Sequence, residues 1–155
     1  MKKAIIGLIC ALFAYFSATA QSSEEISKII KSEKATFAQV SYLPALYANL
    51  ISGDEGSETN LEQTAFDALN QKGYLPAKAT AESEVTLGQL CYIYAKAFDI
   101  KGGLFYTLFP SERYAFKEFK AKGFLPSTAD PSMALSGRDS LDLFNSCLEM
   151  SGGNE

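Results

Sequence analysis

The pentapeptide KGYLP at Lys72–Pro76 returns fifty residues later as KGFLP at Lys122–Pro126. The residues before each copy, FDALNQ and FKEFKA, have the apolar spacing of a helix. A glycine just past a helix end adopts a left-handed backbone at little cost, and the apolar residue after it packs on the last helical turn. The proline that ends each copy prevents the helix from resuming. Both pentapeptides therefore predict a helix stop, with Gly73 and Gly123 at positive φ.

A second helix is expected after each stop. In VTLGQLCYIYAKAF, Thr86 can cap the helix and the side chain of Gln89 can reach back to the cap. In LSGRDSLDLFNSCLEM, Ser136 is the expected cap and Asp139 suits the positive first turn. Each full unit thus consists of a helix, a glycine stop, a loop and a capped helix.

An earlier, incomplete copy begins the series. In ATFAQVSYLPALYANL, Thr36 and Gln39 stand fifty residues before Thr86 and Gln89. Pro44 removes one backbone donor, so it is expected to kink this helix or to end it early. The pattern predicts an all-α, mainly helical fold of about two and a half helix–loop–helix repeats of ~50 residues, forming one pseudo-symmetric bundle. The expected units cover about residues 27–51, 60–99 and 111–150.

Residues 1–20 are interpreted as an export signal, and residues 21–155 as a single domain. Two lysines form a positive start, an apolar run follows at residues 4–16, and ATA at 18–20 is a small-residue cleavage site. The apolar run is too short to span a bilayer as a mature helix, so no transmembrane segment is expected in the mature chain. The expected location is the periplasm or the cell surface of a bacterium.

The charge of the chain bears on its partners. Without residues 1–20 the chain has 12 Lys and Arg against 18 Asp and Glu, a net charge of −6. Nucleic acids and anionic lipids attract clustered positive charge, and the lysines here are scattered along the sequence. No nucleic-acid partner is therefore expected, and an anionic lipid is a poor candidate.

The residue types of most catalytic and metal sites are missing. The chain has no histidine, the commonest general base and metal ligand. Cys91 and Cys147, the two cysteines outside the export signal, are too few for a structural zinc site. We expect no enzymatic activity, no metal and no cofactor. In an oxidising compartment the two cysteines can form a disulfide, or they can stay free as small buried side chains, and both alternatives are open.

The strongest apolar cluster is the stretch GLFYTLFPSERYAF. Its simplest interpretation is core packing between two units. If part of it stays exposed, it would form a partner or membrane surface. The residues of that candidate surface are Leu104, Phe105, Tyr106 and Phe109.

The order of helix, glycine stop, loop and capped helix, repeated at about fifty residues, resembles the S-layer homology domain. The resembling pieces are FDALNQKGYLP with VTLGQL, and FKEFKAKGFLP with LSGRDSL. The resemblance covers most of the chain from residue 60 onward. It implies three units around a pseudo-threefold centre, export, and attachment to peptidoglycan or cell-wall polysaccharide.

The resemblance also implies candidate binding residues. In this family an Arg after the capping Thr contributes to glycan contacts, and in this chain only the last unit has a basic and an acidic residue there, in the order GRD. Arg138 is therefore the first candidate contact, and Asp139, Thr86 and Gln89 are further ligand-binding candidates. Arg113 has no matching motif and is interpreted as a solvated residue in the first turn of a helix.

Two functions remain open at this point. The resemblance implies an exported, non-catalytic module that binds envelope glycan or peptidoglycan. The alternative is a periplasmic structural or assembly protein that binds another envelope protein through its aromatic surface.

Overall fold

The computed structural model describes residues 23–52 and 60–152. The expected export signal, residues 1–20, lies outside the described residues. Within the described residues, no helix is long and apolar enough to cross a bilayer.

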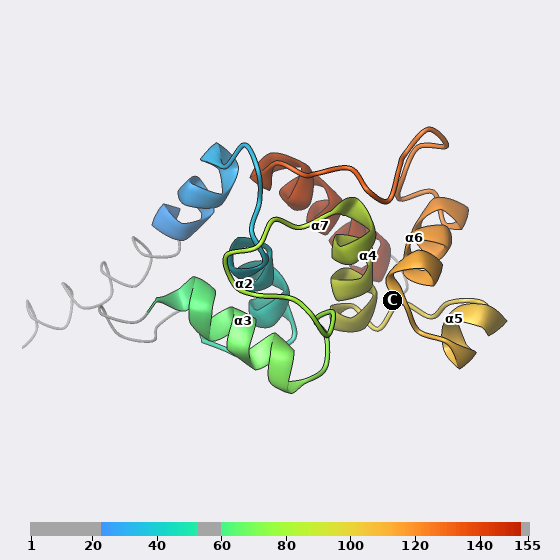
Figure 1. The fold of residues 1–155 in the computed structure, drawn as a ribbon, viewed down its shortest axis with the longest axis horizontal. Helices are drawn as coiled ribbons and strands as arrows, with labels where there is room; N and C mark the ends of the chain where they lie inside the picture. The colour runs from blue at the N-terminus through green and yellow to red at the C-terminus, as the bar shows by residue number, and fades with distance from the viewer. Residues whose placement is uncertain (1–22, 53–59, 153–155) are drawn as a thin grey trace, which may run out of the picture.

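The described chain is mainly helical, as predicted (Figure 1). Residues 23–31 form a first helix. In these residues, extended pairing is limited to two isolated bridges, Thr36 with Glu84 and Thr86 with Ala134. The later helices are α2 (Phe37–Tyr47), α3 (Leu61–Gln71), α4 (Leu87–Ala97), α5 (Leu104–Leu108), α6 (Glu112–Ala121) and α7 (Gly137–Gly152).

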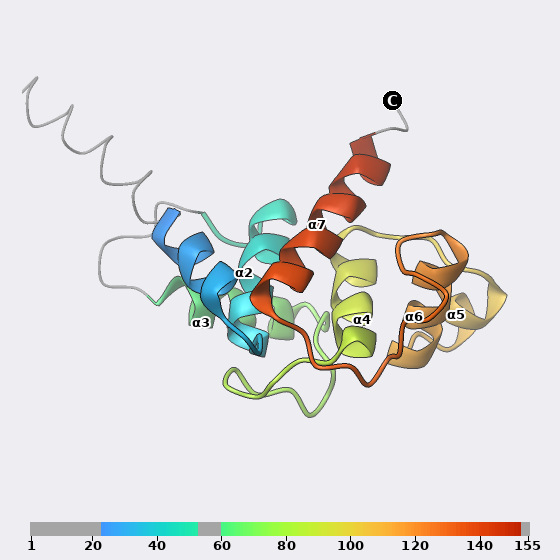
Figure 2. The same ribbon diagram turned by 90° about the horizontal axis from the view of Figure 1, so that it is seen from above.

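Helix α4 occupies the middle of the fold. Figures 1 and 2 show it with α2 and α3 on one side and α5 and α6 on the other. Phe98 is the C-cap residue of α4. Its ring stacks on that of Tyr47 in α2, with centroids 4.1 Å apart, and contacts the ring of Phe144 in α7 edge-on, with centroids 5.2 Å apart. The hydroxyl of Tyr94 donates to the carbonyl of Ser140 at 3.0 Å. The core therefore centres on the meeting of α2, α4 and α7.

The two predicted helix stops are confirmed. Gly73 has φ 69° and Gly123 has φ 82°. In the first copy, the N–H of Tyr74 donates to the carbonyl of Leu69 at 2.9 Å, the long bond of a Schellman ending. In the second copy, the two phenyl rings at the corresponding positions have centroids 4.9 Å apart. These endings set the direction in which the chain leaves α3 and α6.

Helices α2 and α4 end in the same way without glycine, which the sequence analysis missed. Asn49 has φ 53° and Asp99 has φ 48°. The amide of the following residue, Leu50 or Ile100, donates to a carbonyl in the last helical turn at 2.9 Å. Asn and Asp are the residues that tolerate this backbone region best after glycine.

The expected N-caps are present at all three capped helices. The backbone N–H of each cap donates to the side chain three residues later, at 3.1, 3.0 and 3.0 Å. Helix α2 continues through Pro44 to Tyr47, so of the two expected effects of this proline the early end is wrong, and the kink stays a prediction. The three cap pairs are Thr36 with Gln39, Thr86 with Gln89, and Ser136 with Asp139.

Backbone hydrogen bonds tie the first turn of each capped helix to the segment before another capped helix. Three N–H to carbonyl bonds of 2.9 Å run from Ala38 to Ala81, from Gly88 to Pro131, and from Gly137 to Ser32. The N–H of Ala35 adds a bond of 2.7 Å to the carbonyl of Leu135. The bonds from Gly137 to Ser32 and from Ala35 to Leu135, here called the closing link, complete a cycle of α2, α4 and α7.

Candidate functional site

A groove of about 870 Å³ lies between the start of α4, one face of α6 and the segment before α7. It contains two of the ligand candidates from the sequence, Thr86 and Gln89. The lining residues are Thr86, Gly88, Gln89, Glu112, Arg113, Phe116, Lys117, Lys120, Pro131 and Ser132.

The α4 wall is fixed by the helix start. The carbonyl oxygen of the Gln89 side chain accepts from the N–H of Thr86 at 3.0 Å, so the cap holds both residues in place. The N–H of Gly88 donates to the carbonyl of Pro131 at 2.9 Å. A Cβ on Gly88 would lie 3.2 Å from Pro131, so the missing side chain lets the two segments approach. This wall is therefore rigid before any ligand binds.

The α6 wall supplies positive charge above an apolar base. Arg113 and Lys117 are exposed, and neither forms an ion pair with any other described residue. They stand four residues apart and so share one face of the helix. The ring of Phe116 is buried beneath them. Lys120 donates to the carbonyl of Ser127 at 2.6 Å and thereby ties α6 to the following loop.

The charges of the groove favour an anionic ligand. Glu112 is the one carboxylate among the described lining residues, and burial raises its pKa. Three cations, Arg113, Lys117 and Lys120, thus stand against one carboxylate that is partly withdrawn from solvent, and none of the three forms an ion pair with a described residue. A single carboxylate does not provide the acid and base pair that glycoside hydrolysis needs. The arrangement can hold an anion beside an apolar surface.

The structure divides the four ligand candidates from the sequence into two places. Thr86 and Gln89 lie in the groove, whereas Arg138 and Asp139 lie on the first turn of α7. Asp139 accepts hydrogen bonds from the cap Ser136 and lines a separate, mostly apolar hollow of about 340 Å³. Arg138 is exposed. The charged partner of Thr86 and Gln89 is therefore on α6 and not on α7.

Sequence reasoning missed the place of Arg113. The residue is exposed, as interpreted, but the packing of α6 beside α4 puts it at the groove. The available signal was its spacing with Lys117 on the charged face of α6, opposite the buried stripe of Ala115 and Phe119. That spacing alone does not show which other helix lies opposite Arg113 and Lys117.

Helix α5 and the residue after it form a surface, and the interpretation of this segment as packed core is wrong. Leu104, Phe105, Leu108 and Phe109 are exposed. Tyr106 is the exception among the candidate surface residues, because its side chain is buried and packs close to Gly102. The partner-surface alternative therefore applies to the exposed residues Leu104, Phe105, Leu108 and Phe109, and not to Tyr106.

Cys91 and Cys147 are both buried free thiols in the structure. Burial raises the pKa of both thiols, that of Cys147 to about 12. At Cys91 the charge of Cys147 adds a smaller increase. Neutral buried thiols are poor nucleophiles and poor metal ligands. They act here as small core residues.

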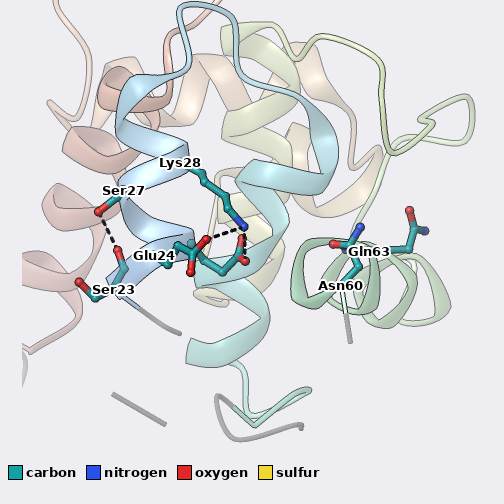
Figure 3. A network of polar contacts seen from close by, with 7 residues as sticks. Ser23, Glu24, Ser27, Lys28, Asn60 and Gln63 are labelled. Atoms are coloured by element: carbon teal, nitrogen blue, oxygen red, sulfur yellow. Dashed lines mark hydrogen bonds and ion pairs between the residues drawn. The ribbon is translucent and has the colours of Figure 1, made fainter. Parts of the chain in front are cut away.

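Lys28 and two glutamates form an ion-pair cluster on the first helix (Figure 3). Lys28 lies 2.9 Å from a carboxylate oxygen of Glu25 and 3.6 Å from one of Glu24. Burial, followed by the charge of Glu25, raises the pKa of Glu62 on α3 to about 7. Among the described residues, no group of three or more metal-ligating side chains is found, here or elsewhere.

Comparison of the chain with protein-family models, with curated proteins and with solved structures finds no match. Function is therefore inferred from the groove and from the surface of α5.

Proposed function

We propose that the chain is an exported, non-catalytic module that binds acidic envelope glycan or peptidoglycan in the groove between α4 and α6. The observation that carries this proposal is the position of Arg113 and Lys117, unpaired and exposed, across the groove from Thr86 and Gln89. The two sides come from different units of the fifty-residue pattern.

The framework supports a relation to the S-layer homology domain. The cap pairs recur at a spacing of fifty residues, as do the two glycine stops. The backbone bond from Ala38 to Ala81 also has its counterpart fifty residues later, from Gly88 to Pro131. The closing link then joins the last capped helix to the segment before the first. We infer one incomplete unit and two full units around a pseudo-threefold centre.

The chemistry of the groove suits a sugar that carries carboxylate or phosphate groups. A guanidinium binds either anion through two parallel hydrogen bonds, so Arg113 supplies both charge and direction. Lys117 adds a second, less directional cation. The ring of Pro131, with the largely buried ring of Phe116 at the base of the groove, offers the apolar surface against which the C–H face of a sugar packs.

The test is sedimentation with purified sacculi from the source bacterium at low salt. Arg113→Gln removes a charge-assisted hydrogen bond, for which a loss of about 1.5–3 kcal/mol is typical, so affinity should fall roughly tenfold or more. The matched control is Arg138→Gln. Both arginines are exposed second residues of a helix, and only Arg113 lines the groove.

The controls distinguish an error in the location of the binding site from an error in the proposed glycan binding. Loss of binding in Arg138→Gln with full binding in Arg113→Gln would refute the groove and place the contact on α7, as the family motif implies. Failure of the wild-type protein to sediment with sacculi would refute glycan binding altogether. Both variants should keep the wild-type melting temperature, because neither side chain is packed in the core.

A further inference from the structure

The exposed apolar surface of α5 lies at one end of the molecule. Figures 1 and 2 both show α5 at the extremity beyond α6, opposite the first helix. Leu104 is 70% exposed, Phe105 and Phe109 are each 63% exposed, and Leu108 is 59% exposed. A contiguous exposed patch of large apolar side chains is often functional.

The charge around α5 differs from the charge of the chain. Residues 99–122 have five Lys or Arg against three Asp or Glu, whereas the whole chain has a net charge of −4. Asp99 is paired with Lys101. Arg113 and Lys117, two exposed cations without ion-pair partners among the described residues, lie on the helix that follows α5. The composition of the chain concealed this local excess of positive charge.

Tyr114 contacts both an apolar side chain of α5 and a cation of α6. The ring of Phe105 stacks on that of Tyr114, with centroids 5.9 Å apart. The ammonium of Lys117 lies 5.7 Å from the centroid of the Tyr114 ring. These are the residue types found together where a protein enters a bilayer surface, with apolar groups in the acyl region and tyrosines and cations near the headgroups.

We propose that α5 and Phe109 insert into the surface of an anionic phospholipid bilayer, with Arg113 and Lys117 at the level of the headgroups. The four apolar side chains expose roughly 450 Å² at the typical size of such residues. A stable protein interface buries about 800 Å² on each partner, so this tip is small for a protein-binding surface. Shallow insertion needs only a protruding apolar tip with cations behind it, and anionic lipid complements their charge.

A single indole can report insertion, because the chain contains no tryptophan. The full chain with Phe109→Trp is mixed with vesicles of phosphatidylcholine, or of phosphatidylcholine with one third phosphatidylglycerol. We expect a blue shift of the indole emission and quenching by brominated acyl chains with the anionic vesicles, and weakening of both effects by salt. Unchanged emission with anionic vesicles would overturn the proposal. A blue shift that depends on protein concentration without lipid would also overturn it, because it would indicate contact between copies of the chain.

Variants separate the tip from the rest of the molecule. Phe105→Ser with Phe109→Ser should lower vesicle binding at least tenfold, while Met133→Ser, at a 50% exposed apolar residue in the segment before α7, should not. Phe109→Ser alone keeps the stacking of Phe105 on Tyr114 and should give an intermediate loss. Equal binding by the double variant and the wild type would refute the role of α5. Sedimentation of the double variant with lipid-free sacculi should stay at the wild-type level, so failure of this proposal is distinguishable from failure of glycan binding.

Discussion

Replacing Gly137 with alanine should displace the first helix from α7. An added Cβ would lie 1.7 Å from the carbonyl oxygen of Ile29 and 2.6 Å from its carbonyl carbon. Carbon atoms in contact are normally about 3.5–4.0 Å apart. The atoms in the way belong to the backbone, so they cannot move without the helix formed by residues 23–31. The substitution therefore acts on the packing between two helices.

The expected cost follows from the interactions that this movement breaks. Ile29 is 1% exposed, and full burial of such a side chain contributes about 1.5–3 kcal/mol. The N–H of Gly137 donates to Ser32, and this bond contributes about 0.5–1.5 kcal/mol. Part of each contribution survives a partial displacement, so we expect a loss of about 3 kcal/mol in the free energy of unfolding. Helix propensity alone predicts the opposite sign, a gain of roughly 0.5–1 kcal/mol.

Urea unfolding followed by circular dichroism measures this difference. The control is Gly88→Ala, in which the added Cβ would lie 3.2 Å from Pro131 and small movements can relieve the contact. We expect the control to lose less than about 1 kcal/mol, since mild overpacking is at the low end of such effects. A midpoint for Gly137→Ala equal to or above that of the wild type would refute the predicted clash between the first helix and α7.

Three further predictions concern backbone, charge and thiols. Gly73→Ala should cost about 1 kcal/mol, because the added Cβ meets nothing within 4 Å and only the left-handed backbone is disfavoured; an unchanged unfolding midpoint would contradict this. The raised pKa of Glu62, caused by burial and then by Glu25, means that the folded chain binds a proton that the unfolded chain releases between pH 4.5 and about 7. Stability should therefore fall as pH rises through that window, and Glu62→Gln should flatten the dependence; parallel pH profiles would count against it. Cys91 and Cys147 should react with iodoacetamide far more slowly in the native than in the denatured protein, and an intact mass showing a disulfide would contradict their free state.

Local rules explain what could be predicted from the sequence. The glycine stops and the three N-caps depend on residues at most five positions apart, so their pattern is visible in the chain itself. The left-handed residues Asn49 and Asp99 obey the same rules but escaped notice. Asn and Asp are frequent in many other turns, so they give a weaker signal than glycine.

Contacts between distant segments explain what could not be predicted. The groove exists because α6 packs beside α4, and no short pattern states which face of α6 meets which end of α4. The apolar composition around Phe105 predicted burial, yet α5 has only five residues and lies beyond the packed helices. The negative net charge of the whole chain likewise gave no indication that Arg113 and Lys117 lie together on one face of α6. Pattern and composition describe segments, while a site depends on how segments meet.

The closing link has a consequence for the timing of folding. Ala35 must find Leu135, one hundred residues later in the chain, before the cycle of α2, α4 and α7 is complete. Contacts of such long sequence separation form late, because the loss of chain entropy precedes the gain from the contact. A nascent chain that ends before residue 135 lacks the carbonyl of Leu135 to which Ala35 donates. It also lacks α7, against whose first residue Ile29 packs. The chain therefore stays incompletely folded until nearly all of it has been synthesised, and an incompletely folded chain is the form that can be threaded through a narrow channel.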